Sequence, residues 1–155
     1  MSNPSKIAEY ISEKLPIYAA FNIKLLTSGS LTGKVCCSPN QLNQNHFNST
    51  HAGVQWMMTE MIGGIIFINN FDIVDYLLVV KRAETDFVKP AFGDIVAEGS
   101  ITGQQLQKIK TDLADEGKAN FEVTVRLSNS DGDELVRTLA TYNVRPTPTD
   151  TTQNS

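Results

Sequence analysis

Hydrophobic residues dominate one long segment of the chain, from His51 to Asn69, which contains the run VQWMMTEMIGGIIFI. On a helix these residues would cover most of the circumference, and a helix that is apolar nearly all round has to be buried on most sides. The segment therefore predicts a central helix with a sheet or a partner chain wrapped around it. Gly63 and Gly64 inside it each cost about 1 kcal/mol of helix stability relative to alanine, which predicts close packing against them.

The segments on either side have the patterns of strands and shorter helices. Asn3-Pro4 is typical of a helix start and Pro16 of a helix end, which predicts an N-terminal helix within residues 1–16. Asp131-Gly132 is a strong hairpin signal, and Gly117 is placed to end a second helix. That helix is expected at 104–116, and strands are expected at 19–26, at 30–38, twice within 76–103 around a break at 90–93, at 119–128 and at 134–145.

Six strands and one long buried helix favour an α+β fold. The connections are mostly short enough for antiparallel pairing, so we expect an antiparallel sheet of about six strands wrapped around one central helix over residues 51–69. A chain of 155 residues is of ordinary size for one domain, and we expect that domain to span residues 1–145. The polar run at 146–155, PTPTDTTQNS, is expected to be a disordered tail.

Composition and charge narrow the possible partners. The net charge is −4, with a pI of about 5.1, so no global field would attract nucleic acid or anionic lipid. No apolar run approaches the roughly 20 residues that a bilayer requires, and the N-terminus has no apolar secretion signal. We therefore expect a cytoplasmic protein that binds neither nucleic acid nor membrane. Cys36 and Cys37 are adjacent and would point to opposite faces of a strand, and we expect no metal site.

Glu60 is the only charged residue between Val54 and Ile68. A carboxylate in the middle of an apolar helix loses solvation, so it has to be paired, protonated or retained for function. One interpretation is a structural ion pair with Lys81, Arg82 or another basic residue. The other is a catalytic acid.

The loop before the helix resembles the signature of hotdog-fold acyl-CoA thioesterases of the phenylacetate-degradation type. It reads Asn45-His46-Phe47-Asn48-Ser49-Thr50-His51-Ala52-Gly53, and is followed by Glu60 and Gly63-Gly64. The family signature has an Asn, a Gly three residues later, then His-Gly-Gly and an acid on the helix. The resemblance covers about residues 18 to 145. It implies the hotdog fold, a homodimer or dimer of dimers, and hydrolysis of an acyl-CoA substrate without a cofactor, with Glu60 and Asn45 as catalytic residues and His51, Ala52 and Gly53 as substrate-binding residues.

Two positions depart from that signature. Asn48 replaces the usual glycine, and because asparagine tolerates the left-handed region, it can preserve the turn. Ala52 replaces the first glycine of the pair and adds a methyl group where substrate would approach. Asparagine in a loop is commonly a turn residue and histidine at a helix start commonly a structural hydrogen-bonder, so the roles of Asn45 and His51 rest on the resemblance.

The spacing of the candidate groups has a consequence for assembly. Thioester hydrolysis places negative charge on a carbonyl oxygen, which the free amides of Ala52 and Gly53 at a helix N-terminus could stabilise. Glu60 could activate water or attack directly. It lies eight residues from Ala52, which is roughly 12 Å along a helix, so the two cannot contact one thioester carbon. Two antiparallel helices across a two-fold axis would bring them together.

Two other functions remain open. A non-catalytic acyl-CoA-binding hotdog domain would fit the extra methyl group of Ala52 and the apolar pair Val79-Val80. A hotdog dehydratase or hydratase is suggested by His46-Phe47, but the surrounding spacing does not keep that register. Turnover of acyl-CoAs of varied chain length separates the thioesterase from the binding domain.

Overall fold

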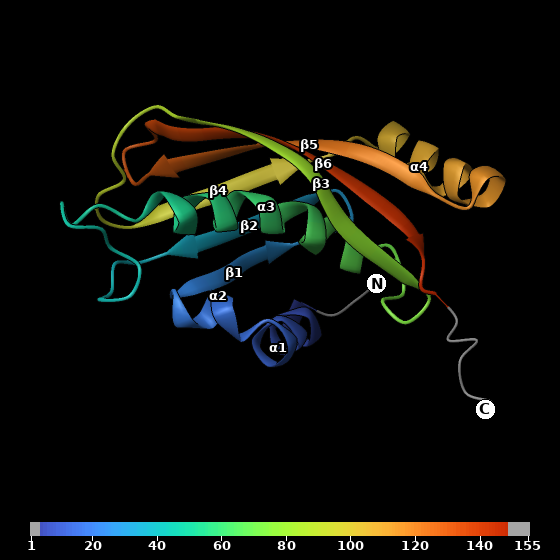
Figure 1. The fold of residues 1–155 in the computed structure, drawn as a ribbon, viewed down its shortest axis with the longest axis horizontal. Coiled ribbons are helices and arrows are strands. Elements are labelled where there is room, and N and C mark those ends of the chain that lie inside the picture. Colours follow the sequence, from blue (N-terminus) through green and yellow to red (C-terminus); the bar gives the residue numbers. More distant parts are fainter. Residues whose placement is uncertain (1–3, 149–155) are drawn as a thin grey trace.

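The computed structural model describes residues 4–148, which form a six-stranded antiparallel sheet and four helices (Figure 1). The strands follow one another across the sheet in the order β1-β2-β4-β5-β6-β3. The elements are α1 (Pro4–Lys14), α2 (Pro16–Ala20), β1 (Ile23–Ser28), β2 (Thr32–Cys37), α3 (Ala52–Ile68), β3 (Tyr76–Phe87), β4 (Ile95–Ser100), α4 (Gly103–Glu116), β5 (Ala119–Asn129) and β6 (Glu134–Pro146).

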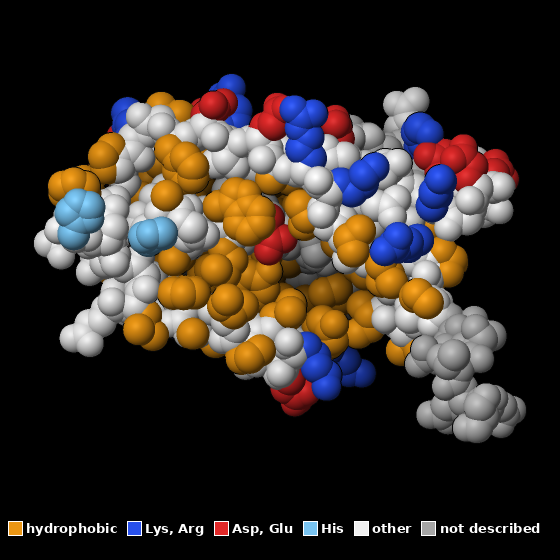
Figure 2. Space-filling model, viewed as in Figure 1, with side chains coloured by type: hydrophobic (Ala, Val, Ile, Leu, Met, Phe, Trp, Pro, Cys, Tyr) orange, Lys and Arg blue, Asp and Glu red, His pale blue; other side chains and the backbone are white. Residues whose placement is uncertain are grey.

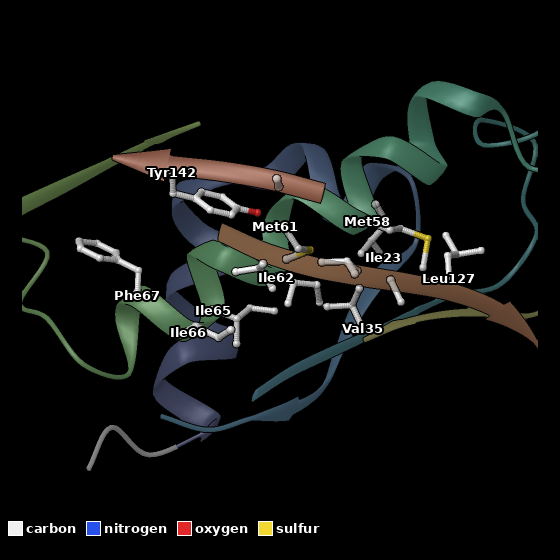
Figure 3. Close-up of a cluster of buried hydrophobic side chains, with 14 of the residues drawn as sticks. Ile23, Val35, Met58, Met61, Ile62, Ile65, Ile66, Phe67, Leu127 and Tyr142 are labelled. Carbon is white, nitrogen blue, oxygen red and sulfur yellow. The ribbon is translucent and has the colours of Figure 1, made fainter. Parts of the chain in front are cut away.

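The sheet curves around α3, which packs against all six strands. Met58, Ile62 and Ile65 of this helix are at most 1% exposed, and they meet Val35 of β2 and Leu127 of β5 in the core (Figure 3). The expectation of a hotdog fold, a sheet wrapped around one long apolar helix, is confirmed. The three other helices pack around this core and add Ile7, Ile11, Tyr18 and Ile109 to it. Helices α1 and α2 pack beside β1, and α4 packs beside β5.

The two adjacent glycines of α3 serve different purposes. The ring of Tyr142 on β6 lies directly against Gly63, where a methyl group would overlap it. The prediction of close packing is therefore right at Gly63. It is wrong at Gly64, where an added methyl group would meet nothing within 4 Å.

The N-terminal region differs from its prediction. Pro16 does end the first helix, but it also begins α2, so Ala19 and Ala20 are helical rather than part of a strand. Proline at a first helical position costs nothing, because its missing N–H would have no helical partner there. The strand starts only at Ile23. At the other end β6 continues to Pro146, and the part of the expected tail at 149–155 lies outside the described residues.

Strand β3 forms one edge of the sheet and runs for 12 residues. Its inner side pairs with β6, and within residues 4–148 no strand pairs with its outer side. Val79 and Val80 on it are each 37% exposed. A long edge with exposed apolar residues is a template for pairing with another strand. None of the helices in the described range is long and apolar enough to cross a bilayer.

Candidate functional site

Glu60 lies half-buried in the middle of α3, on the side turned towards α2. The hydroxyl of Tyr18 on α2 donates a hydrogen bond of 2.7 Å to Oε1 of Glu60. No salt bridge of the described residues includes Glu60, and Arg82 pairs with Glu84 instead. The expected alternative of a structural ion pair with Lys81 or Arg82 is therefore wrong.

The surroundings of Glu60 disfavour its charged form. Burial raises the pKa of this carboxyl group above the ordinary 4.5, and the hydrogen bond from Tyr18 acts in the opposite direction. Burial, together with the nearby charge of Glu60, also raises the pKa of Tyr18 far above its usual range. Tyr18 therefore stays protonated and remains a donor to the carboxylate at every pH at which the protein would work.

A second tyrosine fixes the helix turn that carries Glu60. The hydroxyl of Tyr142 donates to the backbone oxygen of Glu60 at 2.6 Å and accepts from the backbone N–H of Gly63 at 3.3 Å. Tyr142 is fully buried and stacks on Phe121 at 5.1 Å. Its ring occupies the space that a side chain at position 63 would need. The position of Glu60 is thus set by packing from β6, whereas its carboxylate is held from α2.

A small apolar pocket of about 120 Å³ opens beside Glu60. Figure 2 shows a hollow lined with hydrophobic side chains on this face of the molecule. The missing side chain of Gly64, one helical turn beyond Glu60, leaves part of this space open. The walls come from α1, α2, α3 and β3, and consist of Ile11, Leu15, Tyr18, Glu60, Met61, Gly64, Ile65, Ile68, Leu78 and Val80.

His51 caps the N-terminus of α3. Its Nδ1 accepts the N–H of Gly53 at 3.0 Å, and its backbone oxygen accepts the N–H groups of Val54 and Gln55. Within residues 4–148 the N–H of Ala52 has no such partner, and Ala52 is exposed. Of the two amides expected to polarise a carbonyl group, that of Ala52 is free and that of Gly53 already has an acceptor.

The loop before α3 is held by its own side chains. Oδ1 of Asn45 accepts the backbone N–H groups of Phe47 at 3.0 Å and Ser49 at 3.2 Å. Asn48 has φ of 61°, as expected for an asparagine in place of glycine. His46, the residue that suggested a dehydratase, is exposed and stacks on Phe47. Asn45 thus shapes the loop through its carbonyl oxygen.

A wider apolar groove of about 580 Å³ adjoins the N-terminus of α3. Ala52 and Gln55 line it on the helix side, and Phe87, Val88 and Phe92 are exposed on the other side. Gln55 is 5% exposed, and its amide nitrogen donates a hydrogen bond to the backbone oxygen of Thr50 at 2.6 Å. Its Oε1 is buried and has no hydrogen-bond partner in the described part of the chain.

The five candidate residues therefore form two groups, one at the N-terminus of α3 with the loop before it and the other in the middle of the helix. Asn45, His51, Ala52 and Gly53 gather at the N-terminus of α3, and Glu60 lies about 12 Å further along, at 1.5 Å per residue. Tyr18 lies beside Glu60 and is hydrogen-bonded to it. The sequence did not predict this residue as part of the site, because residues 42 positions apart leave no periodic signal. One hint was available: a buried acid without a basic partner needs some hydrogen-bond donor.

Comparison with solved structures identifies relatives of the same fold. The chain superposes on PA5026 of Pseudomonas aeruginosa, described as a protein of unknown function and probable thioesterase, with a TM-score of 0.84, 24% identity and coverage of 95% of this chain and 99% of that one. Thioesterase HI1161 of Haemophilus influenzae gives a TM-score of 0.75 at 11% identity, covering 97% and 96%. Thioesterase PA1618 of Pseudomonas aeruginosa, in a mutant form, gives 0.73 at 15%, covering 95% and 96%.

No protein of curated function matches this sequence. One family profile does match it, over residues 14–144, and its description is a domain of unknown function, DUF4442. That range includes Tyr18, the whole of α3 and every strand of the sheet except the last two residues of β6. The chain belongs to the DUF4442 family.

Proposed function

We propose that this protein is a thioesterase that hydrolyses acyl-CoA thioesters, with Glu60 as its catalytic carboxylate. The observation that carries the proposal is a half-buried acid, without a basic partner in the described residues, that borders an apolar pocket. A buried charge is costly, and a group with a raised pKa in a pocket is a candidate for catalysis. The thioesterase names of the structural neighbours support the same reaction class.

Hydrolysis at this site needs no group beyond those of the protein and water. Glu60 takes a proton from a water molecule while the water oxygen bonds to the thioester carbon. The N–H of Ala52 stabilises the oxyanion that forms. The carbon–sulfur bond then breaks, and the thiolate takes up the proton held by Glu60. Direct attack by the carboxylate, followed by hydrolysis of the anhydride, uses the same residues.

The site is completed by a second copy of the chain in this proposal. Ala52 and Glu60 lie too far apart on α3 to act on one carbon, so each reaction uses Glu60 of one protomer and Ala52 of the other. Two observations support a homodimer: the open outer edge of β3 and its exposed Val79 and Val80. A two-fold arrangement then contains two equivalent sites.

The pocket beside Glu60 suits the acyl group of the substrate. Its lining is apolar apart from Tyr18 and Glu60, and its volume is about 120 Å³. A protein cavity of about 150 Å³ holds a benzene molecule, so an acyl group of about four to six carbons would fill this pocket.

A distant neighbour offers a further parallel. SAV0944 of Staphylococcus aureus, with 12% identity and TM-scores of 0.71 and 0.70, was solved as a glutamate-to-alanine mutant and as a glutamine-to-alanine mutant. The two altered positions of that protein are as far apart in sequence as Asn45 and Glu60 are here. This agreement supports keeping Asn45 in the proposed site, where its amide nitrogen would face the substrate.

A non-catalytic acyl-thioester-binding protein is the second candidate. It is favoured by the hydrogen bond from Gly53 to His51, which leaves one of the two expected amides engaged. The deciding experiment offers the purified protein a panel of acyl-CoAs from two to sixteen carbons and follows thiol release and binding separately. Turnover that is lost in Glu60→Gln and kept in the exposed control Glu116→Gln supports the thioesterase. Binding without turnover in the wild type supports the second candidate.

A further inference from the structure

Tyr18 is placed to control the carboxylate of Glu60. It lies on α2, a helix of five residues that packs beside β1, and it is 8% exposed. The end of this helix is anchored to the core: the backbone oxygen of Phe21 accepts hydrogen bonds from the side-chain amide of Asn43 at 3.0 Å and from Sγ of Cys37 at 3.3 Å. Tyr18 is therefore a fixed donor.

The hydrogen bond from Tyr18 engages only one of the two carboxylate oxygens of Glu60. Oε1 of Glu60 accepts the tyrosine hydroxyl, whereas Oε2 has no hydrogen-bond partner among residues 4–148. Among the described residues, no polar side chain other than those of Tyr18 and Glu60 borders the pocket. A hydrogen bond to a charged group in such surroundings is stronger than one in water. A single donor thus selects one orientation of the carboxylate.

We propose that Tyr18 is a positioning residue, which holds Oε1 of Glu60 and thereby presents Oε2 to the attacking water or the thioester carbon. The inference rests on the proposed thioesterase function. Tyr18 also offsets part of the rise that burial causes in the pKa of Glu60, because its hydrogen bond favours the charged form. The α1–α2 segment, which lies outside the sheet and its central helix, then becomes part of the active site.

The other groups near Glu60 do not provide this function. Tyr142 on β6 bonds to the backbone oxygen of Glu60, so it fixes the helix rather than the carboxylate. The other pocket residues on this side are Ile11 of α1 and Leu15, which caps α2, and those from β3 are Leu78 and Val80; none of them titrates. Tyr18 is the one titratable or charged side chain in the described residues that contacts the carboxylate.

The test replaces Tyr18 by phenylalanine, which keeps the ring and removes the hydroxyl. The ionisation of Glu60 is followed by ¹³C NMR of glutamate side-chain carboxyl groups, with the signal assigned from its absence in Glu60→Gln. We expect the midpoint in Tyr18→Phe to rise by about one pH unit, the size expected for losing a hydrogen bond to a charge. The acid limb of kcat/KM should move by the same amount, and kcat on its plateau should fall about tenfold.

The matched control is Tyr10→Phe, which removes a hydroxyl from a partly buried tyrosine of the neighbouring helix α1, away from the pocket. It should leave both the midpoint and the pH profile unchanged. The positioning role is overturned if Glu60 titrates in Tyr18→Phe as it does in the wild type, or if its midpoint moves while the acid limb stays in place. A wild type that hydrolyses no acyl-CoA would instead overturn the proposed function, and the NMR midpoint would still report whether Tyr18 controls the carboxylate.

Discussion

The two ends of the proposed reaction machinery on α3 are built differently. At the N-terminus, the side chains of Asn45 and His51 accept backbone N–H groups only two to four positions further along the chain. In the middle of the helix, Glu60 depends on Tyr18 and Tyr142, which are 42 and 82 positions away. The N-terminal end offers a donor and the middle offers a base. One straight helix keeps them about 12 Å apart, so in the proposed mechanism each end works with its counterpart from another chain.

Removing either the carboxylate of Glu60 or the free N–H of Ala52 should have the largest effect on activity. Glu60→Gln removes the base and should lower kcat/KM by about 10²–10⁴. Ala52→Pro removes only the free N–H, at the first helical position where proline fits and after a residue, His51, that is already extended (φ −59°, ψ 139°). It should lower kcat by about 10²–10³. Steady-state kinetics on the best acyl-CoA measures both. Near-normal turnover in Ala52→Pro would exclude the helix N-terminus from the reaction.

Substitutions of Gly63 and Gly64 separate core packing from the shape of the proposed acyl pocket. Gly64→Leu should fold normally, because space is open there, but should fill the pocket. We expect kcat/KM for a six-carbon acyl-CoA to fall about tenfold or more, since one or two methylenes in a pocket are worth about 1–3 kcal/mol, while a two-carbon substrate is little affected. The control Gly63→Ala forces Tyr142 aside and should lower the free energy of unfolding by about 1–3 kcal/mol. An unchanged chain-length profile in Gly64→Leu would place the acyl group elsewhere.

The smallest expected effect is a change in how the free energy of unfolding depends on pH. The folded protein retains the proton of Glu60 at pH values where the unfolded chain has lost it. The free energy of unfolding therefore falls as the pH rises from about 4.5 through the raised pKa of the folded state. Glu60→Gln removes this penalty, so thermal unfolding should show equal melting temperatures near pH 4 and a higher value for the variant at pH 8, by about 2–4 °C. A variant that is less stable at pH 8 would mean that the carboxylate has a structural role.

The sequence predicted the fold because its main signals are local. The all-round apolarity of α3 and the turn at Asp131-Gly132, whose glycine has φ of 83°, depend on residues close together in the chain. The candidate site was predicted only in part. A Ser or Thr is the usual helix cap, and the sequence therefore favours Ser49 or Thr50 as the cap of α3. Ser49 instead bonds to the backbone of Ala91, and His51 is the cap.

Tyr18 shows why the rest could not be predicted. Its neighbours Ala19 to Leu26 have a composition compatible with a strand, and this hid the short helix that turns Tyr18 inwards. Its contact with Glu60 depends on how α2 packs beside β1, which is a property of the tertiary structure. The same holds for Gly64, since nothing in the sequence distinguishes the open glycine from the packed one.

The central claim is that each site combines Glu60 of one protomer with Ala52 of the other. Its most direct test is the activity of a mixed dimer of Glu60→Gln and Ala52→Pro, co-expressed with different tags and purified through both. One of its two sites would have both groups intact, so we predict about half of the wild-type activity from two nearly inactive parents. A mixed dimer as inactive as its parents, or no mixed dimer at all, would contradict the shared site.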